Sequence, residues 1–121
     1  WDVEGIGAEP ALIGGFFAAP DPAFRKSFES EFFELFETKP ARLATLAYDA
    51  TALVAVLAQL QGKTKFSENA ITDKNGYLGR DGIFRFLTTG HVQRGLAILR
   101  VKRHNNAVVV PAPESFNVLI N

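Results

Sequence analysis

The stretch ALIGGFFAAP-DPAFRKSFESEFFELF, residues 11–36, decides the fold. Its first part, residues 11–19, is a continuous run of small and apolar residues that ends at Pro20. A run this short, stopped by proline, predicts a buried strand of the kind found in parallel sheets rather than a helix. The adjacent Gly14 and Gly15 support that interpretation, because glycine weakens a helix and allows another backbone to approach.

A helix is predicted to begin directly after this strand. Asp21 can accept hydrogen bonds as the N-cap, and Pro22 fits the first helical position, where the N–H that it lacks has no intrahelical partner. Phenylalanines then recur every four residues, at Phe24, Phe28, Phe32 and Phe36. The glutamates lie on the other faces, and Lys39-Pro40 ends the helix. We interpret the phenylalanine stripe as a surface that packs in a core.

A second helix is predicted over residues 43–60, with apolar residues at three- and four-residue spacing and alanines on the other faces. Because few of its residues are strongly polar, we expect it to be covered on more than one side. Gly62 is the predicted helix stop, and Ser67 can cap a short helical turn.

From Gly76 the hydrophobic pattern changes to a period of two, which is typical of strands. Strands are predicted at residues 83–86, 96–102 and 107–110, with turns at residues 88–90 and 105–106 between them. Together they predict an antiparallel hairpin or meander. Residues 116–120 form an apolar tail that needs a partner surface.

Composition and motifs exclude several classes of function. Lys plus Arg and Asp plus Glu each number 13, so no overall charge favours nucleic acid or an anionic membrane. Cysteine is absent, and His91 and His104 are interpreted as exposed turn residues. The sequence contains no nucleophile-elbow, phosphate-loop or metalloprotease motif, and Asp81 beside Arg80 is interpreted as an exposed turn pair. We therefore predict a non-enzyme without a catalytic residue, metal or cofactor.

Other features indicate a piece of a longer protein. The sequence has no methionine and begins at Trp1. One strand, two helices and a meander also provide too few parallel strands for a complete doubly wound sheet. We expect an α/β fragment that needs the missing N-terminal part of the same protein, or a second copy, to cover its apolar surfaces.

Motifs along nearly the whole chain resemble the C-terminal third of type I periplasmic binding proteins in the leucine/isoleucine/valine-binding family. In order, they are GGFFAAP at 14–20, DPAFRKSFESEFF at 21–33, KPARLATLAYDATAL at 39–53, GYLGRDGIFRF at 76–86 and RGLAILRV at 94–101. They look most similar to the penicillin-binding protein activator-like branch. The resemblance implies the C-terminal part of a two-lobed, Rossmann-like α/β fold with a terminal antiparallel strand pair, residues 82–86 and 96–101.

The same resemblance implies how residues 1–121 are organised. Residues 1–20 would be a loop and a strand that crosses the hinge between the lobes, residues 21–62 the two helices, and residues 76–121 the antiparallel strands and tail. The candidate ligand-binding residues are Trp1, Asp2, Arg42, Leu43 and Tyr48. Asp2 would meet a ligand ammonium group, Trp1 would wall the pocket, and the loop that contains Leu43 would reach into the cleft. Packing alone is the alternative role for Tyr48.

The function implied by the resemblance is that of a non-catalytic periplasmic receptor. It would bind a small solute, an amino acid in particular, and hand it to the membrane subunits of an ABC-type importer. The alternative is an envelope lipoprotein-type module that docks onto an enzyme of peptidoglycan synthesis without transporting a solute. Either protein would lie in the periplasm, where an upstream segment can carry a lipid anchor.

Overall fold

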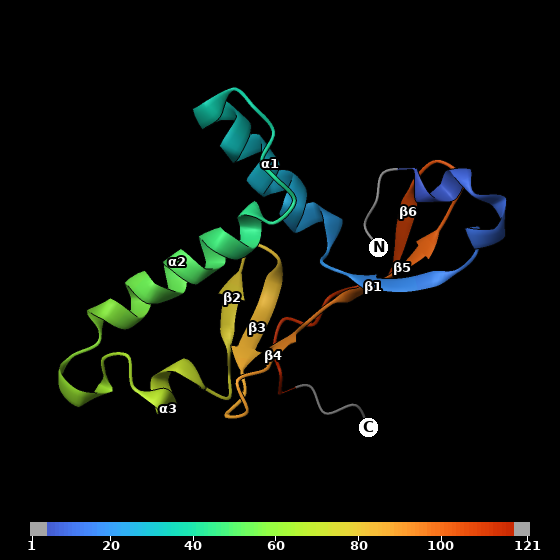
Figure 1. Cartoon of the computed structure of the whole chain (residues 1–121). Helices are drawn as coiled ribbons and strands as arrows, with labels where there is room; N and C mark the ends of the chain where they lie inside the picture. Colours follow the sequence, from blue (N-terminus) through green and yellow to red (C-terminus); the bar gives the residue numbers. More distant parts are fainter. Residues whose placement is uncertain (1–4, 118–121) are drawn as a thin grey trace.

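The computed structural model describes residues 5–117, which form two parts with one small antiparallel sheet each (Figure 1). The strand part, residues 5–19 and 97–110, contains η1 (Ile6–Ala8), η2 (Pro10–Leu12), β1 (Phe16–Ala19), β5 (Ala97–Val101) and β6 (Asn106–Val110). The helical part, residues 22–94, contains α1 (Pro22–Phe36), α2 (Ala44–Gln59), η3 (Gly62–Thr64), α3 (Glu68–Ile71), β2 (Tyr77–Gly79), β3 (Gly82–Phe86) and β4 (Val92–Arg94). The described helices include none that is both long and apolar enough to cross a membrane. The expected mixed α/β class is confirmed.

The two sheets correct one predicted pairing. The strand part has the order β1-β5-β6 and the helical part the order β2-β3-β4, and all described pairings are antiparallel. The predicted pair of residues 82–86 and 96–101 is therefore wrong, because β3 and β5 belong to different sheets. The period-two pattern missed β2 and β4, which have only three residues each. Gly95 and Leu96 then carry the chain out of one sheet and into the other.

The strand predicted over residues 11–19 is shorter and less buried than expected. Residues Pro10–Leu12 form a 3-10 helix, which the carboxylate of Glu9 caps by accepting from Ala11 N–H at 3.4 Å. Gly14 then turns the chain at φ +91°, so only Phe16–Ala19 is extended. This strand pairs antiparallel with β5, and of its residues only Ala19 is buried. Polar capping and a left-handed glycine thus override the apolar pattern.

The two long helices form as predicted, but their packing differs. Asp21 caps α1 by accepting from Ala23 N–H at 2.9 Å, and Pro22 is its first residue. Of the phenylalanine stripe, Phe28 is buried, whereas Phe36 is 60% exposed. The reason is visible in Figure 1, where α1 projects from the body of the molecule and only the start of α2 lies beside it. The stripe is therefore not a core within the described chain.

One face of α2 is covered rather than several. Its buried residues follow a four-residue spacing: Thr45, Asp49, Leu53 and Leu57. Leu53 and Leu57 pack with Phe84 of β3 in the core of the helical part. On the other faces Val54 and Val56 are more than half exposed. The helix also ends at Gln59, with Leu60 as its C-cap, before the predicted stop at Gly62, which instead begins η3.

Three segments of the described chain cross between the two parts. Pro20 and Asp21 join β1 to α1, and Gly95 and Leu96 join β4 to β5. After β6, the chain returns to the helical part, where Phe116 lies under the guanidinium of Arg85 at 4.4 Å (Figure 1). The predicted tail thus finds a partner at Phe116, while residues 118–121 lie outside the described residues.

Small side chains next to the three crossing segments allow their backbones to lie close together. Ala19 pairs in register with Ala97, and both are buried in a cluster with Leu99. Ala112, from the returning segment, packs against the same cluster. Because alanine keeps neighbouring backbones close, the three crossings form a narrow joint rather than a broad interface.

Gly95 lies at the centre of this joint, where the surrounding side chains leave no room for a Cβ atom. A Cβ at this position would lie 2.7 Å from Cγ2 of Ile83 and 2.8 Å from Cγ of Pro113. We expect Gly95→Ala to lower the free energy of unfolding by about 1–3 kcal/mol, because it overpacks the joint. Urea unfolding measures the loss. Gly15→Ala is the matched control, since its Cβ meets only Leu12 O, at 3.1 Å, and a loss as large there would contradict the explanation.

Candidate functional site

A groove separates the two parts on one side of the joint. It has a volume of about 730 Å³. Its wall on the helical part is the first half of α1, with Pro22, Arg25, Lys26 and Glu29. Its wall on the strand part consists of residues 5–7 and the β5–β6 turn, residues 102–106. A space of this size, between two parts joined by crossing segments, has the dimensions of a small-molecule site.

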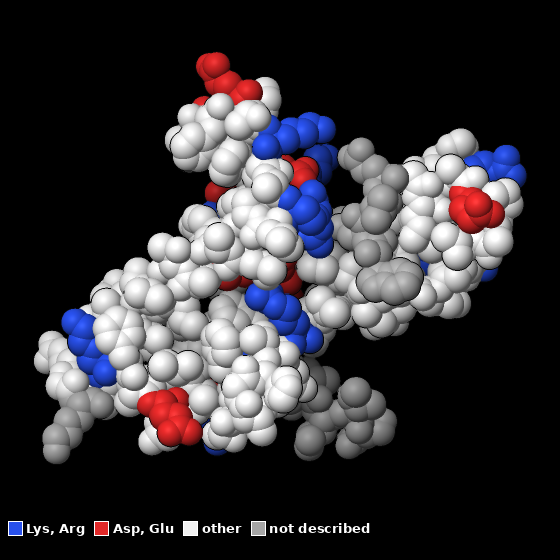
Figure 2. Space-filling view, in the orientation of Figure 1, with Lys and Arg blue, Asp and Glu red and all other residues white. Residues whose placement is uncertain are grey.

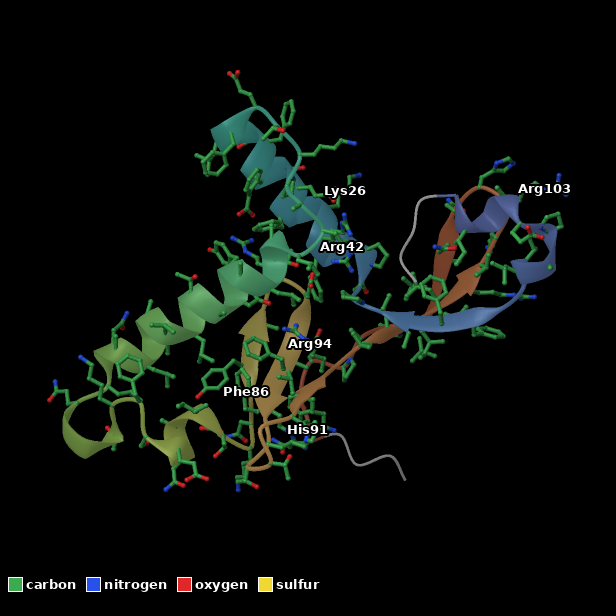
Figure 3. The ribbon with its side chains drawn as sticks, in the orientation of Figure 1. Lys26, Arg42, Phe86, His91, Arg94 and Arg103 are labelled. Carbon is green, nitrogen blue, oxygen red and sulfur yellow. The ribbon has the colours of Figure 1, made fainter. Side chains whose placement is uncertain are left out.

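Positive charge dominates the described lining of this inter-part groove. Arg25 and Lys26 lie on α1, and Lys102 and Arg103 lie on the β5–β6 turn. Figure 2 shows Lys and Arg side chains along the side of α1 that faces the strand part, and Figure 3 labels Lys26 there and Arg103 on the opposite part. Glu29 is the one acidic residue of the described lining, and it accepts from Arg25 Nε at 2.6 Å.

A second polar cluster lies in the helical part, under the tight turn between β2 and β3. Asp49 of α2 is 4% exposed, and its Oδ1 accepts from Arg80 N–H at 2.6 Å. The backbone N–H of Asp81 also favours the charged form of this carboxylate and lowers its pKa. Gly79 makes room for it, because a Cβ there would lie 2.3 Å from Asp49 Oδ2. Asp49 thus ties the β2–β3 turn to α2.

Asp81 is buried, which corrects the prediction of an exposed turn pair. It is 3% exposed, and its Oδ2 accepts from the hydroxyl of Thr45 at 2.8 Å. Nη1 of Arg42 lies 4.0 Å from the same oxygen. The helix α2 covers Asp81, so that one member of a sequence-local pair of charges becomes part of a buried network.

The side chain of Arg80, unlike that of Asp81, is partly exposed, and it connects the β2–β3 turn to α1 and α2. Its guanidinium donates to both carboxylate oxygens of Glu31 on α1, at 3.0 and 2.7 Å. It also lies 5.0 Å over the ring of Tyr48 on α2, and this ring meets Phe28 edge to face at 5.7 Å. The side chain of Arg80 therefore holds α1 and α2 at a fixed position relative to the β2–β3 turn.

Burial and charge shift two acids of this cluster in opposite directions. Burial raises the pKa of Asp49, and the N–H groups of Arg80 and Asp81 oppose that rise only in part. The hydrogen bond from Arg80 lowers the pKa of the exposed Glu31. Burial therefore makes the charge of Asp49 unfavourable to the fold, although turn donors stabilise it.

Of the predicted ligand-binding residues, the three that the structure describes do not line the inter-part groove. Trp1 and Asp2 lie outside the described residues. Leu43, at the start of α2, is 67% exposed, and Tyr48 lies in the Arg80 contacts rather than in the inter-part groove. Arg42 lies near Asp81 at the base of α1 (Figure 3). The cationic side chains of the groove were missed, although the basic run at residues 100–104 offered a signal.

Comparisons with known proteins identify the fold. No family model and no curated protein matches the chain. Among solved structures, it is similar to a putative branched-chain amino acid ABC transporter protein from Rhodospirillum rubrum, with a TM-score of 0.65 and 24% identity over 84% of this chain. It is also similar to a leucine-binding protein from Thermotoga maritima, with a TM-score of 0.50 and 21% identity over 88% of this chain.

A third similar structure is a solute-binding protein of an ABC transporter from R. palustris, solved with benzoate. Its TM-score is 0.52, at 15% identity over 92% of this chain. The chain spans 32%, 33% and 34% of the lengths of these three structures. At these identities the likeness concerns the fold: residues 5–117 have the architecture of part of a type I periplasmic binding protein.

Proposed function

We propose that this chain is the C-terminal section of a solute-binding receptor of an ABC-type importer, with an amino acid as its solute. The observation that supports this best is the joint of three crossings beside the inter-part groove. Two parts that are connected by narrow crossing segments can rotate about them, and a solute between the parts contacts both of them only when they approach.

The similar structures support the same assignment. One of them is described as a branched-chain amino acid transporter protein, one as a leucine-binding protein, and the third was solved with benzoate. Each description therefore names a solute or solute class that carries a carboxylate. The proposed location is the periplasm, and the proposed partners are the membrane subunits of the importer. Within this proposal, Arg42, Leu43 and Tyr48 remain candidates for contact with the solute or with the rest of the receptor.

Thermal unfolding of the full-length protein against a panel of amino acids and benzoate tests the proposal. We expect at least one solute to raise the unfolding temperature by an amount that grows with the logarithm of its concentration. Small-angle scattering should show a smaller radius of gyration with the same solute, because closure brings the two lobes together. No stabilisation by any solute, together with retention of a peptidoglycan synthase in a pull-down, would favour the docking alternative instead.

A further inference from the structure

The inter-part groove concentrates charge in a chain that has none overall. The full sequence has equal numbers of acidic and basic residues. The described lining of the groove has four cations and one acid. Because Arg25 and Glu29 neutralise each other, the excess comes from Lys26, Lys102 and Arg103. These three form no ion pair with a described residue.

The unpaired cations lie on both walls. Lys26 projects from α1 in the helical part, and Lys102 and Arg103 belong to the β5–β6 turn in the strand part (Figure 3). A groove lined by one sign of charge raises the local concentration of ligands of the opposite sign. As the parts approach, the repulsion between the walls grows, and this repulsion disfavours closure of the empty receptor.

A ligand with a single carboxylate can neutralise only one wall, whereas a ligand with two carboxylates can meet both. A second unpaired group supports a ligand that also carries a donor. Asn106 lines the groove, and its Oδ1, which is shielded from solvent without a solute, has no hydrogen-bond partner among the described residues. An amine or a hydroxyl group of the ligand can donate to this oxygen.

We propose that the solute of this receptor is a small dicarboxylate, of the acidic amino acid type, rather than a branched-chain amino acid. The inference rests on the proposed function, because it assumes that the parts close on a solute in this groove. Both carboxylates of such a solute are ionised at neutral pH. The solute would bridge Lys26 on one wall and the β5–β6 turn on the other.

Matched pairs of solutes test this assignment by titration calorimetry on the full-length protein. The pairs are L-glutamate with L-glutamine, and succinate with butyrate, which differ in charge at nearly constant size; L-leucine is the neutral reference. We expect the dicarboxylate of each pair to bind at least roughly tenfold more tightly than its partner. Raising the ionic strength should weaken binding of the dicarboxylates more than binding of the other members.

The double variant Lys26→Gln/Arg103→Gln tests the residues. Both side chains are exposed, so the unfolding temperature without solute should stay unchanged. The preference for glutamate over glutamine should fall by roughly tenfold, because the variant removes a charge from each wall. Lys39→Gln is the matched control, as this exposed lysine lies outside the groove lining and should leave the preference unchanged.

The outcomes separate the two proposals. Binding of leucine or glutamine as tight as that of glutamate would overturn the dicarboxylate assignment and leave the receptor function standing. A glutamate preference that survives the double variant would also overturn it, because the charges named here would then not be its source. Absence of binding by every solute would overturn the receptor function and this inference together.

Discussion

Phe84→Ala should lower the free energy of unfolding by about 3–5 kcal/mol, the cost of removing a large aromatic side chain from a packed core. Phe84 is 3% exposed and packs with Leu53 and Leu57 of α2. Its ring lies 6.0 Å from those of Tyr77 in β2 and Phe86 in its own strand, so it joins β2 and β3 to the helix.

The ring of Phe84 also makes a cation–π contact with Arg94. The guanidinium of Arg94 lies 5.0 Å over Phe84, and Nη1 of Arg94 is buried without a hydrogen-bond partner among the described residues. Removal of the ring would take away the contact that partly compensates this burial. The loss should therefore lie near the upper end of the range rather than the lower.

Phe16→Ala provides the control for this prediction, because it is the same change at an exposed site. Phe16 of β1 is 65% exposed, and its described ring contact is Arg100, at 5.8 Å. We expect its loss to stay below about 1 kcal/mol. Urea unfolding followed by circular dichroism compares the two, and similar midpoints for both variants would show that Phe84 does not anchor the core.

Local signals in the sequence were sufficient for the helices. Asp21 and Pro22 define the start of α1 through capping and backbone geometry, which act within a few residues. The same holds for Ser67, which caps α3 by accepting from Ala70 N–H. Such predictions succeed because the interactions that decide them lie within one turn of the chain.

The sheets and the exposed faces depend on distant residues and could not be predicted in the same way. β2 and β4 are too short to give a pattern, and the choice of β1 as the partner of β5 is made across most of the chain. The exposure of Phe36 and Val54 depends on what lies beside α1 and α2. A pattern of apolar residues predicts which face of a helix is favourable to bury. It does not show whether the described part of the chain packs against that face.

The burial of Asp49 could have been predicted from the spacing of residues in α2. Thr45, Asp49, Leu53 and Leu57 lie four residues apart on one stripe of α2. Two polar residues that continue an apolar stripe predict a buried polar partner, since an unpaired buried carboxylate is costly. The partner is a tight turn that Gly79 and Gly82 flank in the sequence, and the N–H of Arg80 in this turn donates to Asp49.

Asp49→Ala should therefore be strongly destabilising, whereas Asp49→Asn should not. Alanine would leave the N–H of Arg80 without its acceptor, at a cost of about 1–3 kcal/mol, and would remove the carboxylate that the N–H of Asp81 also favours. Asparagine keeps an acceptor oxygen for Arg80 N–H and removes a charge that burial makes unfavourable. We expect the asparagine variant to lie within about 1 kcal/mol of the wild type near neutral pH.

The pH dependence of unfolding distinguishes the role of the charge from that of the oxygen. Burial raises the pKa of Asp49 in the folded protein above its unfolded value, so the folded state binds this proton more tightly. The contribution of Asp49 is therefore most favourable below the unfolded pKa and is lost as the pH rises through the folded pKa. Asp49→Asn should remove this component, which is measured by urea unfolding of both proteins at a series of pH values. If asparagine destabilises the protein as much as alanine at neutral pH, the negative charge, through Arg94 and the turn donors, is what holds α2 to the β2–β3 turn.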